Sequence, residues 1–155
     1  MAVSTLIDND IFLKLAVCDV LEAAFELFSV TSEEVGILGT LPFIIDSKKI
    51  QNKYNPEERE KLRLATQSFL KIQTPTSGYF QSLQMNPAID IGEASLIATA
   101  IELEGSLIWT GDKRCLQALY NNSELKNIHK LLQGRVICLE QIIAKLIQNK
   151  DFTSI

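Results

Sequence analysis

The sequence predicts an α/β protein, a three-layer α/β/α sandwich built around a mostly parallel sheet. Short apolar runs of strand length alternate along the chain with longer segments that begin at helix caps. Two of these runs are followed, directly or one residue later, by an aspartate, Asp8 and Asp112. The chain has 155 residues, of which 46% are hydrophobic, so we expect one domain over residues 1–155 with a substantial core.

The first half of the chain predicts one strand and three helices. Val3–Ile7 is short, apolar and partly β-branched, as in a buried strand. Apolar positions from Ile11 to Phe28 predict a helix that runs almost to Ser29. The Thr-x-x-Glu pattern of residues 31–34 is that of a capping box and predicts a second helix start. Residues 55–58, Asn-Pro-Glu-Glu, predict a third start, and this helix should continue to about Ile72.

The second half predicts two strand–helix units. Residues 73–90 contain Pro75, Gly78 and Pro87 and are expected to be mainly loop. After this loop, the predicted elements are a capped helix over 90–105, a strand over 106–110, a helix from 112 to about 120, a polar link, a strand over 135–139 and a helix over 140–149.

Composition narrows the functional classes. The net charge is −4, so no global positive field indicates a nucleic-acid binder, although a metal-dependent nuclease must itself carry clustered carboxylates. Cys18, Cys115 and Cys138 lack zinc spacing and are expected to be reduced core cysteines. The single histidine, His129, is expected to have a surface or packing role. The chain start lacks the basic flank of a signal peptide and no apolar run has membrane-spanning length, so we expect a cytoplasmic protein.

Three acidic residues are expected to converge on a divalent-metal site. Asp8 and Asp112 each lie just past a predicted strand, and the carboxyl ends of parallel strands share one edge of the sheet. Glu93 lies one turn before Ile97 at the edge of the predicted buried helix face, whereas Glu102 comes out on the opposite side. An inward carboxylate is costly unless paired, and a hard cation such as Mg²⁺ would pair with it. Asp10 is a candidate fourth ligand.

Each of these acids also has a structural interpretation. Asp90 and Glu93 have the spacing of a capping box, and Asp112 or Asp10 would serve as a helix N-cap. A group of basic residues would contact a phosphate backbone or form a solvated helix face: Lys48, Lys49, Lys53, Arg59, Lys61 and Arg63. Lys113 and Arg114 directly follow Asp112, at the predicted site.

Three segments, in order, resemble the motifs of PIN domains. Residues 6–12, Leu-Ile-Asp-Asn-Asp-Ile-Phe, are similar to the strand-end motif that opens this family. Residues 90–94 and 97–100 resemble its central helix with an inward acid, and residues 106–114 resemble the following strand with its Thr-x-Asp ending.

The resemblance implies metal-dependent hydrolysis of single-stranded RNA, as in toxin-type PIN ribonucleases. It implies that Asp8, Glu93 and Asp112 bind Mg²⁺ or Mn²⁺, that Thr110 orients the cluster, and that Asp10 and Asp90 support it. An antitoxin and a second copy of the chain are the implied protein partners. Family members often carry another acid on the second helix, but neither Glu33 nor Glu34 falls at that place, which Leu38 or Gly39 occupies.

Two other functions remain open on the sequence. Asp8-Asn9-Asp10 also matches the Asp-x-Asp motif of haloacid-dehalogenase-type phosphatases, in which Asp8 would be a nucleophile, but that family gives Glu93 no role. A noncatalytic PIN-like module would bind RNA or a protein partner without cutting. Residues 41–45 would then form a partner face if exposed, although we expect this apolar stretch to be core.

Overall fold

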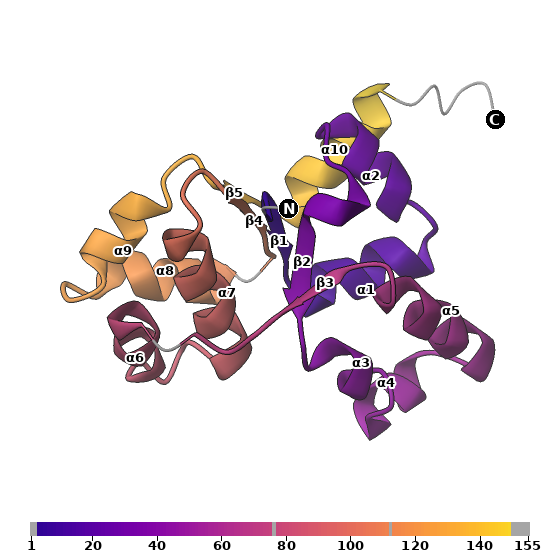
Figure 1. Cartoon of the computed structure of the whole chain (residues 1–155), viewed down its shortest axis with the longest axis horizontal. Coiled ribbons are helices and arrows are strands. Elements are labelled where there is room, and N and C mark those ends of the chain that lie inside the picture. The colour runs from indigo at the N-terminus through magenta and orange to yellow at the C-terminus, as the bar shows by residue number, and fades with distance from the viewer. Residues whose placement is uncertain (1–2, 76, 112, 150–155) are drawn as a thin grey trace.

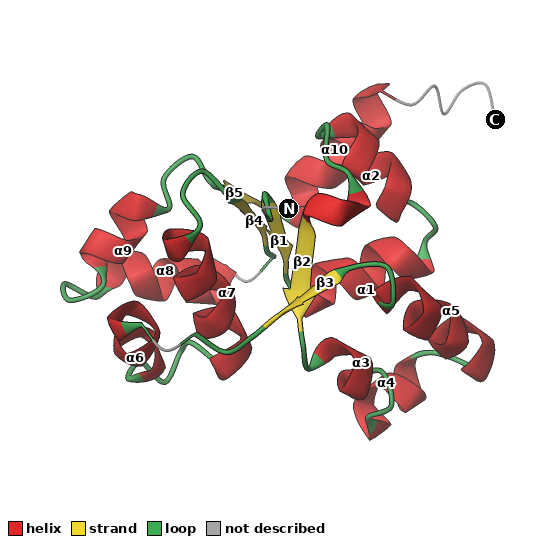
Figure 2. Ribbon diagram, in the orientation of Figure 1, coloured by secondary structure: helices red, strands yellow, loops and turns green. Residues whose placement is uncertain are grey.

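The computed structural model of the protein describes residues 3–75, 77–111 and 113–149 and contains one five-stranded sheet. The strand order is β3-β2-β1-β4-β5, and all four neighbouring pairs are parallel (Figure 2). The strands are β1 (Thr5–Ile7), β2 (Val35–Leu38), β3 (Leu70–Ile72), β4 (Leu107–Trp109) and β5 (Val136–Ile137). The predicted parallel α/β class is therefore confirmed.

Helices cover both faces of this sheet, which makes the three layers (Figure 1). On one face lie α1 (Asn9–Val17), α2 (Leu21–Leu27), α5 (Pro56–Thr66) and α10 (Leu139–Asn149), together with the short α3 (Leu41–Ile44) and α4 (Lys48–Lys53). On the other face lie α6 (Gly78–Gln84), α7 (Ile91–Glu102), α8 (Lys113–Asn121) and α9 (Lys126–Leu131).

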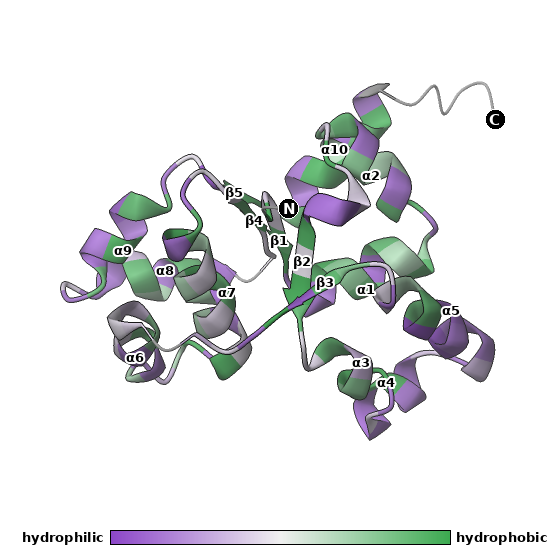
Figure 3. Cartoon of the chain, viewed as in Figure 1, coloured by the Kyte–Doolittle hydropathy of each residue, from purple (hydrophilic) through white to green (hydrophobic). Residues whose placement is uncertain are grey.

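Alternation along the strands sorts the side chains between two cores. Ile7 and Trp109 pack into the core beneath α1, whereas Leu6 and Ile108, each one residue earlier, pack beneath α7. All four are almost completely buried, and Figure 3 shows the strands as largely hydrophobic. A parallel sheet buried on both faces requires such continuous apolar runs.

The predicted N-terminal helix is in fact two helices. The chain turns at Asp19, whose φ is 59°, and the amide of Val20 donates to the carbonyl of Leu15 at 3.0 Å. A left-handed residue with this hydrogen bond ends a helix, so α1 stops before α2 begins. Glycine usually occupies such a left-handed position, but here the residue is an aspartate. The turn was therefore not predictable from the sequence.

The helix predicted from Thr31 is wrong. The capping box itself is present, but it closes only a single 3-10 turn, η1 (Ser32–Glu34), and the chain then enters β2. All four residues of β2 are buried. Their short length and two β-branched residues were the signal of a strand.

The helix starting at Asn55 also ends earlier than predicted. α5 begins at the predicted Asn55 cap but stops at Thr66, and residues 70–72 form the edge strand β3. Two further helices, α6 and α9, lie where a loop and a polar link were expected. By contrast, α7, β4, α8, β5 and α10 fall within two or three residues of their predicted bounds.

Three smaller expectations have mixed outcomes. Cys115 is buried as predicted, but Cys18 is exposed. In the 41–45 stretch Leu41 and Ile45 are core, whereas Phe43 is 78% exposed. None of the described helices is both long and apolar enough to cross a membrane.

Candidate functional site

A cleft of about 540 Å³ opens at the carboxyl edge of the sheet. We call it the acidic cleft, because four of the residues that line it are Asp8, Asp10, Asp90 and Glu93. Its walls come from the residues after β1, from the end of β2, from α4 and from the start of α7. In Figure 1 this edge is where the β2 arrow points, between α7 and the α3–α4 pair.

Asp8 lies between the end of β1 and the first turn of α1. Its amide donates to the carbonyl of Trp109 at 2.9 Å, which extends the β1–β4 pairing by one residue. Its carboxylate does not cap α1; instead Oδ2 accepts a hydrogen bond from the Thr110 hydroxyl at 3.4 Å. The side chain is thereby turned toward β4 and the cleft.

The pKa of Asp8 is raised from 3.8 to about 6. Burial is the main cause, because it penalises the charged carboxylate, and the negative charges of Asp10 and Asp90 add to the effect. A carboxylate held in this way is stabilised by a nearby cation, because a positive charge reverses the same electrostatic terms.

Glu93 lies in the first turn of α7 and is 8% exposed. It lines the same cleft as Asp8. Asp90 is the N-cap of this helix, because its Oδ1 accepts from the amide of Glu93 at 2.8 Å. The capping role predicted for Asp90 is thus confirmed, and it positions the turn that carries Glu93.

Asp112, the third predicted acid, lies outside the described residues. Its chain neighbours Gly111 and Lys113 both line the acidic cleft. Among residues 3–75, 77–111 and 113–149, no three acidic, histidine or cysteine side chains come close enough together to hold a metal ion. The described part of the chain therefore brings together Asp8 and Glu93 only as lining of one cleft.

Asp10 lies on the first turn of α1 and is not a cap. Its Oδ2 is 2.9 Å from the Nζ of Lys14, one turn further along the helix. More than half of the Asp10 side chain is exposed, so a rearrangement of this surface ion pair costs little.

Only some of the predicted basic contacts face the cleft. Lys49 and Lys53, on α4, line it, and neither forms an ion pair with a described residue. Lys113 also lines it but is 3.1 Å from Glu140. Arg114 is exposed on α8, outside the described lining.

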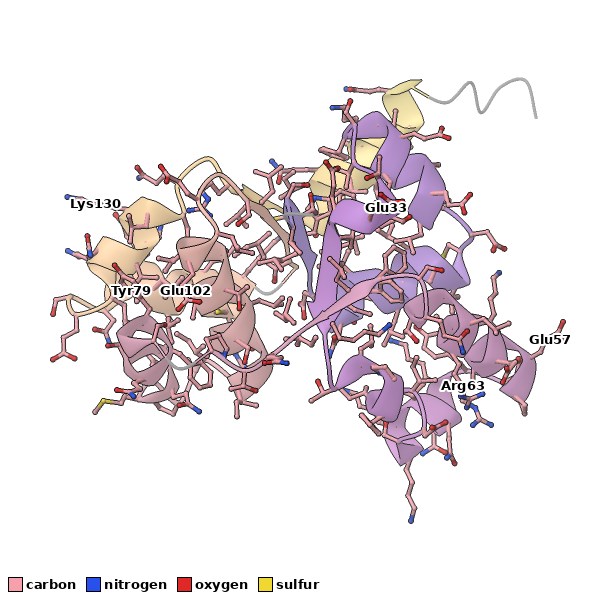
Figure 4. The ribbon with its side chains drawn as sticks, viewed as in Figure 1. Glu33, Glu57, Arg63, Tyr79, Glu102 and Lys130 are labelled. Carbon is pink, nitrogen blue, oxygen red and sulfur yellow. The ribbon has the colours of Figure 1, made fainter. Side chains whose placement is uncertain are left out.

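The other basic candidates are not among the described residues that line the cleft: Lys48, Arg59, Lys61 and Arg63. Lys61 pairs with Asp19, and Arg63 pairs with Asp46 and Glu60 on the outer face of α5. Figure 4 shows Arg63 and Glu57 on that outer side of the molecule. His129 packs edge to face against Tyr120, with ring centroids 5.3 Å apart, which agrees with the expected packing role.

Asn9 and Leu38 are among the lining residues that were not predicted as site residues. The Oδ1 atom of Asn9 is buried and accepts no hydrogen bond from the described part of the chain. Leu38 ends β2 beside the acids. Glu33, labelled in Figure 4, lies at the opposite end of β2, so it cannot supply the additional acid. The position of Asn9 next to Asp8 was the available signal.

Comparison with known proteins supports the fold. No family model and no curated protein matches the chain. The crystal structure of PAE2754 from Pyrobaculum aerophilum is similar, with a TM-score of 0.58 and 18% identity, covering 96% of this chain and 100% of that chain. At this identity the likeness establishes a shared fold and nothing about activity.

Proposed function

We propose that the protein is a PIN-like ribonuclease that hydrolyses single-stranded RNA with Mg²⁺ or Mn²⁺. One observation carries this proposal: Asp8 and Glu93, from distant parts of the chain, line the same cleft at the carboxyl edge of a parallel sheet. That edge is where α/β folds place their functional residues. The resemblance of residues 6–12, 90–100 and 106–114 to PIN motifs supports the same conclusion.

The donor set fits a hard cation. The titratable groups among the described lining residues are carboxylates and lysines, with no histidine or cysteine, and oxygen ligands are those that Mg²⁺ and Mn²⁺ prefer. The burial that raises the pKa of Asp8 is the electrostatic cost that a bound cation offsets. Asp8, Glu93 and Asp112 are the proposed ligands, and Mg²⁺ would keep several waters as its remaining ligands.

Residues around the proposed metal ligands would have distinct roles in the reaction. When bound, the metal polarises the scissile phosphate and lowers the pKa of a water molecule. Thr110 holds the Asp8 carboxylate in position through its hydroxyl. Lys49 and Lys53, on α4, line the same cleft and would attract the RNA phosphates. Asp90 fixes the helix start that carries Glu93.

The deciding experiment is cleavage of a mixed single-stranded RNA pool in Mn²⁺ or EDTA. We expect wild-type protein to cleave only with metal, and Asp8→Asn, Glu93→Gln and Asp112→Asn to lose at least about 100-fold of the rate. Glu102→Gln is the matched control, because Glu102 lies on the same helix as Glu93 but is exposed (Figure 4). Metal-independent cleavage, or full activity in all three variants, would contradict the proposal.

A second candidate is a noncatalytic PIN-like module that binds RNA or protein. The observation that favours it is Leu38, which lines the cleft near the place where the family often carries another acid. In this case pure wild-type protein does not cleave RNA in the experiment above.

The biological setting is proposed from the resemblance alone. We propose a cytoplasmic toxin-type protein that pairs with an antitoxin and forms a homodimer. Phe43, an exposed aromatic on α3, offers one apolar contact for such a partner.

A further inference from the structure

A second hollow, of about 880 Å³, adjoins the acidic cleft at the same edge of the sheet. We call it the polar hollow. It extends over the ends of β2 and β3, away from Asp8, and ends at the first turns of α7. The two hollows share five lining residues, namely Asn9, Leu38, Ile44, Asp90 and Gly92. They therefore form one continuous groove with two chemically different halves.

Uncharged polar residues supply most of the hydrogen-bonding side chains that line the polar hollow. Thr40, Gln73 and Thr74 line it, and their side chains make no hydrogen bond within the described part of the chain. The buried Oδ1 of Asn9, at the boundary with the acidic cleft, also lacks a described donor. Thr40, Gln73 and Thr74 are exposed, so water can satisfy their polar groups in the free protein, and a ligand with its own donors and acceptors can replace that water.

The hollow also has apolar walls. Leu38, Ile44 and Ile72 line it, and Ile91 stands at the start of α7 with 64% of its surface exposed. Apolar side chains beside uncharged amides and hydroxyls are the surroundings in which proteins hold a planar base.

The polar hollow offers a phosphate fewer lysines than the acidic cleft does. The Lys71 ammonium donates to the backbone carbonyls of Thr66 and Phe69, so its charge is committed to the turn before β3. Lys49 and Lys53, which line only the acidic cleft, are in no ion pair with a described residue.

We infer that the polar hollow is a nucleobase subsite that seats one base of an RNA strand whose phosphates lie in the acidic cleft. Gln73 and Thr74 hydrogen-bond the edge of the base, and Ile72 and Ile91 contact its face. This inference rests on the proposed function, because it takes RNA as the substrate. It adds the part of the groove that recognises a base, which the acidic residues do not address.

The test compares two fluorescein-labelled probes of equal charge: a mixed-sequence RNA octamer and an octamer with the same sugar–phosphate backbone but no bases. Binding is measured by fluorescence anisotropy in EDTA at low ionic strength, so that cleavage does not contribute. We expect wild-type protein to prefer the base-carrying octamer by at least about tenfold. The double variant Gln73→Ala/Thr74→Val should lose about fivefold or more of that preference while binding the abasic octamer unchanged.

The matched control is Gln81→Ala/Ser82→Ala, an exposed pair on α6 outside the lining of the groove, which should keep the wild-type preference. Equal affinity of wild-type protein for both octamers, or no affinity for either, overturns the inference. So does a double variant that weakens both octamers equally. Because the assay contains no metal, failure of RNA cleavage in Mn²⁺ would remove the nuclease proposal and leave this result standing.

Discussion

At the scale of single residues, the buried charge of Asp8 lowers the stability of the fold, although we propose that the same charge binds the metal. Its pKa is about 6 in the folded protein and 3.8 in the absence of the fold. The folded state therefore binds more protons between these values, and stability falls as pH rises from about 4 to 6. The cost above pH 6 is at most about 3 kcal/mol.

Asp8→Asn should therefore stabilise the metal-free protein. The neutral amide removes the buried charge, so we expect the free energy of unfolding in EDTA to rise by up to about 3 kcal/mol near neutral pH. The gain should disappear below about pH 4, where the wild-type carboxyl is protonated in both states. Urea denaturation at several pH values measures this difference. A variant that is less stable than wild type at neutral pH would show that the Thr110 hydrogen bond outweighs burial.

Lys49 and Lys53 should govern electrostatic binding of RNA. Both lysines line the acidic cleft, and neither is in an ion pair with a described residue. Replacement of either by Gln should weaken binding and reduce the slope of log K against log salt by about 0.7, the value for one single-strand phosphate contact. Lys48→Gln, on the same helix but outside the cleft lining, is the control and should leave the slope unchanged.

At the scale of elements, α7 depends on its cap. The Asp90 carboxylate accepts the Glu93 amide, so Asp90→Ala should cost about 1 kcal/mol of stability. Asp90→Asn should cost much less, because Asn caps a helix about as well as Asp does. Thermal denaturation of the two variants separates capping from charge. Equal losses in both would show that the charge of Asp90, and not its cap, is the stabilising feature.

A side chain at residue 36 would crowd the contact between β1, β2 and β3. A Cβ atom there would lie 3.0 Å from both Ile72 Cγ2 and Leu6 Cδ2. We expect Gly36→Ala to destabilise the protein by about 1–3 kcal/mol through overpacking. Gly78→Ala is the matched control, because a Cβ at the start of α6 meets nothing within 4 Å and should be neutral or stabilising. Chemical denaturation of both variants tests the pair, and an equally stable Gly36→Ala protein would show that the strands separate readily.

At the scale of the whole molecule, metal binding and folding should be linked. An ion that binds only the folded state stabilises it by about 2.7 kcal/mol at 100 times its Kd. We expect Mn²⁺ to raise the Tm by about 5 °C or more near neutral pH. The rise should shrink as pH falls through about 6, because protons then compete for Asp8. Asp112→Asn should abolish the shift and Glu102→Gln should preserve it; the same shift in both variants would place the ion elsewhere.

The predictable part of the fold lies mostly in the second half of the chain. There the helix over 91–102 and the strand over 107–109 have clear caps and buried faces, so local pattern and final structure agree. β3 was not predictable in this way: Leu70 and Lys71 are exposed on an edge strand, and only pairing with β2 defines them as strand. β2 was not predicted because a capping box, which usually starts a helix, ends at Glu34, directly before the strand.

By itself the sequence determined the α/β class, the caps at Asn55 and Asp90, and the expectation that acids meet at one sheet edge. These follow from local periodicity and from the few conformations open to each residue type. Only the tertiary structure decided which distant groups face the same space: that Lys49 joins Asp8 and Glu93 while Lys61 and Arg63 do not, and that Gln73 and Thr74 open a second hollow beside them. The reason is that strand order and register, set by packing between distant segments, place side chains that no spacing along the chain relates.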